Sequence, residues 1–257
     1  MLWSEKDLII LPITFVILLA ITVGLYMWLR RKSAKIKMIP FYVIAAVIIV
    51  LEIIKQTHWI WEGREYSKFW IPLHTCSAFL LAVPFAVFLK QGRKVTNIFW
   101  AISVMMAFAI FVGLYIVAPE QIISISVLQS VSSLQADYLG YQTFLFHNLV
   151  ILFLMLVVAL KPYSPKGKDL FWAVVIYGAF MAVSAVMANA IQTNFAQFIN
   201  FHVGALNDIR DRYGYFVFDL MLWVLYTFAA AVAALIVFWV NQFYRRLALR
   251  VRAGRKT

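Results

Sequence analysis

Long apolar runs dominate the chain, and short polar or basic stretches separate them at regular intervals. A helix needs roughly 20 consecutive apolar residues to cross a hydrocarbon core of about 30 Å. Seven segments meet this requirement, so the pattern predicts an all-α fold, a polytopic membrane bundle of seven helices. The expected spans are residues 8–29, 38–58, 71–89, 98–117, 141–160, 170–190 and 215–240. We expect residues 1–257 to form a single transmembrane domain with a basic cytoplasmic tail at 244–257.

The charge distribution supports a membrane protein and indicates the orientation of the chain across the membrane. Only 13% of the residues are charged, whereas soluble domains carry about 25%. Lys and Arg gather in the first, third and fifth connections and in the tail, which by the positive-inside rule predicts an external N-terminus and a cytoplasmic C-terminus. The net charge of +12 lies in short loops and the tail and not on a soluble face, so we expect no nucleic-acid partner. We expect an integral membrane protein of a bacterial plasma membrane.

The ends of the chain and two longer connections complete the topology. The N-terminal stretch "MLWSEKDLIILP" lacks the basic region and the cleavage site of a signal peptide, so the first apolar segment is expected to be a permanent span. Residues 124–137 are too polar to span a membrane, and residues 194–214 mix aromatic and polar side chains. We expect both connections to lie at the outer interface.

Polar residues inside the spans fall at one depth. Ionisable groups in a membrane helix are costly and face the bundle interior or a watery cavity. Five different spans place such groups in the outer half, which predicts one outward-opening pocket. The alternative is that these residues sit near helix ends, where they meet interfacial water or cap a neighbouring helix. The candidate residues are Glu52, Gln56, His74, Cys76, His147, Asn189, Asn194 and Asp219.

Cys76 is the only cysteine and the candidate nucleophile. Pro72 favours a helix start, which would put Cys76 near the positive end of the helix dipole, where negative charge is stabilised. His147, from another span at the same depth, is the candidate base. His74 is two residues from Cys76 and would point away from it on a regular helix, so we expect a supporting role for His74. Cys76 could equally be a small buried hydrophobe, and Glu52 could simply pair with Lys55.

Metal and cofactor chemistry has weak sequence support. Zinc accepts the donor set of His74, Cys76 and His147, but no metal-ligand spacing occurs locally. Haem held by histidines from two helices has no signature either. We therefore expect neither a metal nor a cofactor.

Several motifs together resemble the YwaF-like family of integral membrane proteins. The segment "WIPLHTCSAFLL" is similar to the Leu-Pro-Leu-His-x-Cys motif of that family. Other features occur in the same order as in that family over residues 45–235. They are Glu52 upstream of the motif, and His147 in "TFLFHNLVILF" and the element "QTNFAQF" downstream of it. Phe146 and Gln192 stand where the family pattern has glycine.

The resemblance implies six or seven spans and a cysteine-dependent acyl transfer, because the family includes a vertebrate endoplasmic-reticulum acyltransferase acting on phospholipids. By this resemblance Cys76 would accept the acyl group and His147 would act as the base.

The leading hypothesis is an acyltransferase whose partners are membrane lipids, with acyl donor and acceptor in the outer leaflet. Glu52 or Asp219 would orient an imidazole, and His74 and Asn194 could donate to the oxyanion, at about 3 kcal/mol per donor. A transporter or a small-ligand binding protein could use the same pocket, although the sequence lacks inverted repeats. A non-catalytic assembly factor, in which the polar residues join helices, is the third possibility.

Overall fold

The computed structural model describes residues 5–62, 68, 71–113, 138–199 and 204–254, and every regular element within them is a helix. The expected interfacial segment 124–137 lies outside the described residues. In chain order the elements are α1 (Glu5–Leu29), α2 (Ala34–Lys37), α3 (Ile39–Glu62), α4 (Ser77–Phe88), α5 (Lys94–Val112), α7 (Tyr138–Leu160), α8 (Gly167–Ile191), η4 (Phe195–Gln197), α9 (Gly204–Tyr213) and α10 (Tyr215–Gly254).

The all-helical membrane fold is confirmed, whereas the count of seven spans is not. Six helices of the described chain are long and apolar enough to cross a membrane: α1, α3, α5, α7, α8 and α10. The remaining predicted span, residues 71–89, contains only the 12-residue helix α4. Twelve residues rise about 18 Å, which is less than the roughly 30 Å of a hydrocarbon core. The first part of that segment therefore enters the bundle without helical structure.

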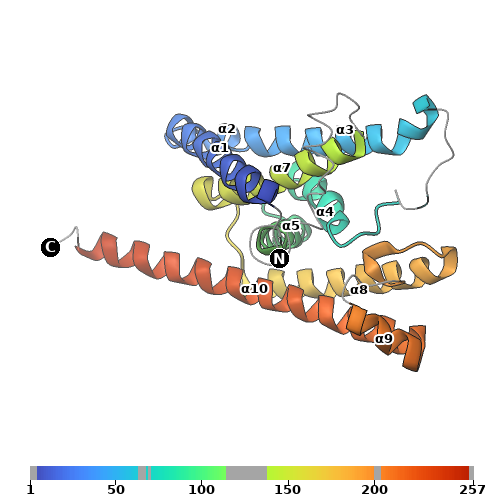
Figure 1. The fold of residues 1–257 in the computed structure, drawn as a ribbon. Helices are drawn as coiled ribbons and strands as arrows, with labels where there is room; N and C mark the ends of the chain where they lie inside the picture. Colours follow the sequence, from blue (N-terminus) through green and yellow to red (C-terminus); the bar gives the residue numbers. More distant parts are fainter. Residues whose placement is uncertain (1–4, 63–67, 69–70, 114–137, 200–203, 255–257) are drawn as a thin grey trace.

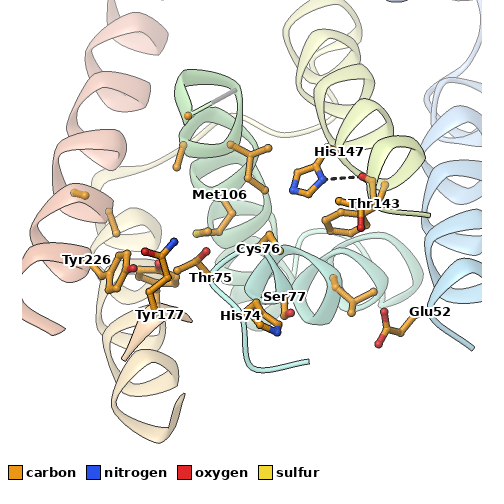
Figure 2. A pocket seen from close by; sticks show the side chains of 18 of the residues that line it. Glu52, His74, Thr75, Cys76, Ser77, Met106, Thr143, His147, Tyr177 and Tyr226 are labelled. Atoms are coloured by element: carbon orange, nitrogen blue, oxygen red, sulfur yellow. Dashed lines mark hydrogen bonds between the residues drawn. The ribbon is translucent and has the colours of Figure 1, made fainter. Parts of the chain in front are cut away.

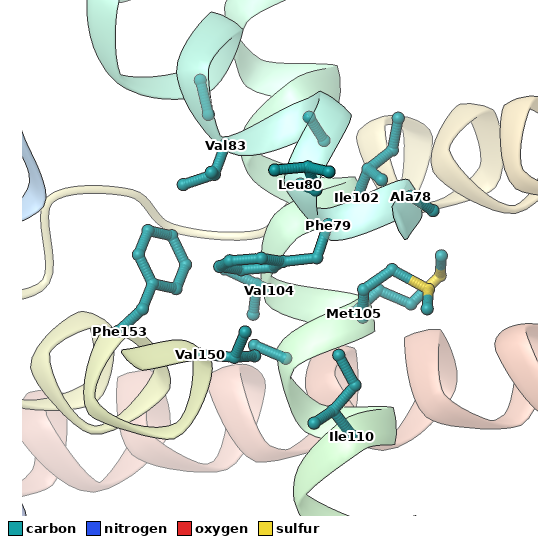
Figure 3. Packing of buried hydrophobic residues seen from close by; sticks show 14 of the residues in the cluster. Ala78, Phe79, Leu80, Val83, Ile102, Val104, Met105, Ile110, Val150 and Phe153 are labelled. Carbon is teal, nitrogen blue, oxygen red and sulfur yellow. The ribbon is translucent and has the colours of Figure 1, made fainter. Parts of the chain in front are cut away.

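Helix α5 lies at the centre of the bundle (Figure 1). It packs against α4, α7, α8 and α10, while α1 and α3 pack on α7. Aromatic rings fill the space between these helices: Phe153 of α7 lies 5.2–5.6 Å, centroid to centroid, from Phe41, Phe79 and Trp100. Figure 3 shows Phe79 and Phe153 among the apolar side chains of α4, α5 and α7. This packed layer fixes the positions of the helices that carry the site.

The outer surfaces of the helices are apolar as well. Phe216 of α10 is 80% exposed, and Val186 of α8 and Phe228 of α10 are exposed to a similar degree. Extended apolar surface of this kind is rare on soluble monomers and marks a surface that another phase covers. The exposed faces agree with insertion of the bundle in lipid.

Helix α10 continues beyond the membrane segment. Its 40 residues rise about 60 Å, and its C-terminal end projects away from the other helices (Figure 1). The predicted basic tail, residues 244–257, is thus the last part of the same helix as far as Gly254. The stretch "RRLALRVRA" consists mainly of good helix formers and has no glycine or proline to end the helix.

Candidate functional site

One cavity of about 540 Å³ opens between α3, the start of α4, α5, α7, α8 and α10 (Figure 2). This volume lies within the roughly 300–1,000 Å³ typical of ligand pockets. Four of the predicted site residues line it, namely Glu52, His74, Cys76 and His147. The other lining residues are Lys55, Thr75, Ser77, Leu80, Met106, Ala109, Ile110, Gly113, Gln142, Thr143, Phe146, Tyr177, Gln197, Tyr226, Ala229 and Ala230.

The turn before α4 carries the centre of the cavity wall. The helix starts at Ser77, so the expectation of a helix start at Pro72 is wrong. Short-range bonds fold the backbone into turns instead, with Leu73 N–H donating to Ile71 O at 2.7 Å and Ser77 N–H to His74 O at 2.9 Å. Proline fits the first turn of a helix but does not enforce one, and here the chain turns before it becomes helical.

This turn also corrects the expected orientation of His74. On a regular helix His74 and Cys76 would face apart, but both line the cavity because the backbone between them is not helical. Irregular backbone at membrane depth is tolerated only where it is buried in protein or lines a cavity. The turn at 71–76 meets that condition.

Cys76 is the residue that immediately precedes α4, and its thiol is free and partly buried. Figure 2 shows it in the middle of the cavity wall, between residues of α7 on one side and of α8 and α10 on the other. Within the described residues no hydrogen bond joins Cys76 Sγ to the imidazole of His147. The two side chains share the cavity without contacting each other through a hydrogen bond.

His147 is held in one orientation by its own helix. Its Nδ1 lies 2.7 Å from the carbonyl oxygen of Thr143. A carbonyl accepts and cannot donate, so Nδ1 carries the proton, and in the neutral ring Nε2 keeps a free lone pair. The side chain is 7% exposed and lines the cavity. The arrangement provides a buried proton acceptor on the side of α7.

Charged groups of α3 form a second polar part of the wall. Lys55 Nζ lies 2.7 Å from Glu52 Oε2, and Gln56 Nε2 donates to Glu52 Oε1 at 2.6 Å. The pairing of Glu52 with Lys55, one of the two interpretations of Glu52, is present in the structure. Gln56 supports the pair but is not part of the cavity wall.

A strained turn after α8 brings Gln197 to the cavity. Gln192, Ala196 and Gln197 have positive φ angles of 53°, 46° and 65°. A side chain in this left-handed region costs roughly 1–2 kcal/mol per residue, and such strain clusters at functional sites. The hydroxyl of Tyr226 in α10 donates to Ala196 O at 2.8 Å and holds the turn in place. Asn194 supports the same turn, since its Oδ1 accepts from Ile199 N–H at 3.0 Å, and it does not line the cavity.

Replacing Ala196 with glycine is expected to stabilise the protein by about 1 kcal/mol, because glycine adopts a positive φ without a steric cost. For a chain of this size the melting temperature in detergent should rise by about 2–4 °C. The matched control is Ala185→Gly, a similarly buried alanine inside α8, where the same change should lower stability by about 1 kcal/mol. A lower melting temperature for Ala196→Gly would contradict the strain at this turn.

Asn189 and Asp219 form a separate contact between α8 and α10. Asn189 Nδ2 donates to Asp219 Oδ2 at 2.6 Å, while Asp219 Oδ1 is enclosed and has no partner in the described part of the chain. Neither residue lines the cavity. Asn189 and Asp219 were expected to line the pocket, but in the structure they join two helices.

Several cavity residues were missed by sequence reasoning. Lys55 was considered only as a partner of Glu52, and the polar residues Thr75, Gln142 and Gln197 do not stand out from their surroundings. Tyr177 and Tyr226 are indistinguishable in sequence from the many aromatic residues that pack or face lipid. No group of three His, Cys, Asp or Glu side chains in the described ranges lies close enough to hold a metal ion.

Comparison with known proteins gives one result at the level of the family. The model of the TMEM164 family matches residues 2–242, nearly the whole chain. No curated protein and no solved structure matches the chain.

Proposed function

Since this chain belongs to the TMEM164 family of membrane proteins, we propose that it is a membrane-embedded acyltransferase that moves an acyl chain between lipids through a thioester on Cys76. The observation that supports the proposal best is the shared cavity. It combines the single thiol of the chain with an imidazole whose Nε2 is free to accept a proton.

In the first half-reaction Cys76 attacks the ester carbonyl carbon of the donor lipid. The thiol proton passes to His147 Nε2 while the bond between Sγ and the carbonyl carbon forms. The ester C–O bond then breaks, and the leaving oxygen takes the proton back from Nε2. The products are a lysolipid with a free hydroxyl and an acyl thioester on Cys76.

In the second half-reaction a hydroxyl of the acceptor lipid attacks the thioester. His147 Nε2 takes the hydroxyl proton, a new ester C–O bond forms and the C–S bond breaks. The proton on Nε2 then returns to the sulfur, which restores the thiol. No oxidant, metal or further reactant is needed.

The walls of the cavity suit a lipid substrate. Leu80, Met106 and Ile110 supply apolar contacts deep between α4 and α5. Ala229 lines the cavity and is exposed on α10, next to the lipid-facing Phe228. Small side chains on α10 therefore leave an approach for an acyl chain from the side of the bundle. Under the predicted topology the cavity would open toward the outer leaflet, so donor and acceptor would be lipids of that leaflet.

Labelling with a lipid-like, thiol-reactive probe tests the proposal. The wild-type protein in proteoliposomes is expected to react with an alkyl-chain chloroacetamide at Cys76 much faster than with a short, soluble chloroacetamide. The soluble reagent measures how accessible the thiol is, and the ratio of the two rates measures how well the cavity accepts a chain. Equal rates for both reagents would remove the support for a lipid site.

A ligand-binding or transport function is the second candidate, and the ion pair of Lys55 with Glu52 favours it. A pair of opposite charges in the wall of the cavity could hold a small charged solute. In this case Cys76→Ala should keep the function, whereas Lys55→Met should remove it. The proposed acyltransferase should instead lose its activity in Cys76→Ala.

A further inference from the structure

The hydroxyl of Tyr177 is a polar group of the cavity that has no role in the two half-reactions described above. Tyr177 lies in the middle of α8, is only 4% exposed and lines the cavity. Buried hydroxyls normally find a hydrogen-bond partner. In the part of the chain that the structure describes, the Tyr177 hydroxyl has none.

Two other partly or fully buried tyrosines show the normal situation. Tyr226, on the same cavity wall, donates to Ala196 O at 2.8 Å, and Tyr163, outside the cavity, donates to Asp169 Oδ2 at 3.0 Å. Tyr177 differs from both in keeping its donor free. Its ring is held by the neighbouring helix turn, where it stacks on Phe180 at 6.5 Å between ring centroids.

The position of this hydroxyl relative to Cys76 suits it to contact the carbonyl oxygen of a bound ester. The side chains of Tyr177 and Cys76 line the same cavity. In Figure 2 Cys76 stands between His147 on one side and Tyr177 on the other. When a thiol attacks an ester, the proton leaves toward the base, and negative charge develops on the carbonyl oxygen. A donor on the side away from the base is placed to meet that oxygen.

We propose that Tyr177 donates a hydrogen bond to the oxyanion of the tetrahedral intermediate formed at Cys76. This inference rests on the proposed acyl transfer at the same cavity. It assigns the oxyanion role to a residue of α8 and replaces Asn194, which does not line the cavity. An unpartnered donor is available for this task, because no existing hydrogen bond has to break when charge develops.

An alkyl trifluoromethyl ketone tests the inference without knowledge of the natural lipid. Its carbonyl adds a thiol reversibly to give a tetrahedral adduct whose oxygen occupies the position of the oxyanion. Binding to the full-length protein in detergent would be followed by ¹⁹F NMR, which separates the free ketone from the adduct. Wild type, Tyr177→Phe, Cys76→Ser and the control Tyr163→Phe would be compared.

Tyr177→Phe is expected to weaken the adduct by about 10- to 100-fold, the effect of losing one hydrogen bond to a charged oxygen. Its melting temperature should not fall, since the lost hydroxyl has no partner among the residues that the structure describes. Tyr163→Phe should lower the melting temperature and leave adduct formation unchanged. This combination separates an oxyanion donor from a residue that only maintains the fold.

Two other outcomes distinguish a failure of the Tyr177 inference from a failure of the acyltransferase proposal. Equal adduct affinity for Tyr177→Phe and wild type, with no adduct in Cys76→Ser, would overturn the role of Tyr177 and leave the acyltransferase proposal standing. A wild-type protein that forms no more adduct than Cys76→Ser would overturn both.

Discussion

Replacing Cys76 with serine is expected to reduce acyl transfer between lipids by at least about 10³-fold, as for the loss of a nucleophile from a catalytic triad. The serine hydroxyl has nearly the volume of the thiol but gives up its proton far less readily, so it is a much weaker nucleophile at neutral pH. The measurement is transfer of a fluorescent acyl chain from phosphatidylcholine to a lysophospholipid in proteoliposomes that contain the full-length protein.

The control for this substitution is Ser103→Ala. The Ser103 hydroxyl is buried in α5 and donates to Phe99 O at 2.9 Å, outside the cavity wall. Its removal should leave the transfer rate unchanged. Transfer that continues at the wild-type rate in Cys76→Ser would exclude the thioester route and favour the ligand-binding alternative.

Replacing His147 with asparagine is expected to lower the transfer rate by about 10²–10⁴-fold, the usual contribution of a positioned base. The asparagine amide can take the place of Nδ1 and keep the hydrogen bond to Thr143 O. It has no counterpart of Nε2, so the proton acceptor is lost while the local fold is kept. The melting temperature of this variant should therefore stay close to that of the wild type.

Two comparisons make the His147 experiment specific. His147→Gln loses the bond to Thr143 O as well, so its rate should fall similarly but its melting temperature should drop further. Raising the pH should partly restore the rate of His147→Asn, because more of the thiol is ionised without a base. If the protein were a non-catalytic assembly factor, the His147 variants would lower the melting temperature. No acyl transfer would be measured at any pH.

The sequence predicted the membrane fold because span length and hydrophobicity follow from the bilayer alone. Six of the seven expected segments are long apolar helices. The seventh was misread at its start, since hydrophobicity cannot tell an apolar helix from an apolar turn that enters the bundle. The irregular turn at 71–76 depends on the cavity that it faces, and that cavity is formed by helices far away in sequence.

Part of the cavity lining could also be anticipated from the sequence, because polar groups inside apolar spans are costly. Glu52, His74, Cys76 and His147 were recognisable as costly polar groups at one depth, and they line one cavity. Depth alone does not determine which face of a helix points inward. Asn189 and Asp219 therefore lay at a suitable depth but pair between α8 and α10.

The residues that sequence reasoning missed are those whose role depends on tertiary contacts. Tyr177 becomes conspicuous only because, within the described ranges, its hydroxyl has no partner whereas that of Tyr226 has one. The strained turn at Ala196 and Gln197 is likewise invisible in sequence, because neither residue type favours a positive φ. The pairing of Lys55 with Glu52 could be anticipated from their spacing, but the position of Lys55 in the cavity wall could not.

The central claim is that Cys76 carries the acyl group, and the mass of the peptide containing Cys76 tests it most directly. Purified full-length protein would be incubated with dipalmitoyl phosphatidylcholine vesicles without an acceptor, digested and analysed by mass spectrometry. The account predicts that this peptide gains one palmitoyl group and loses it on treatment with neutral hydroxylamine, which cleaves thioesters. Unmodified Cys76 in a preparation that transfers acyl chains once an acceptor is added would contradict it.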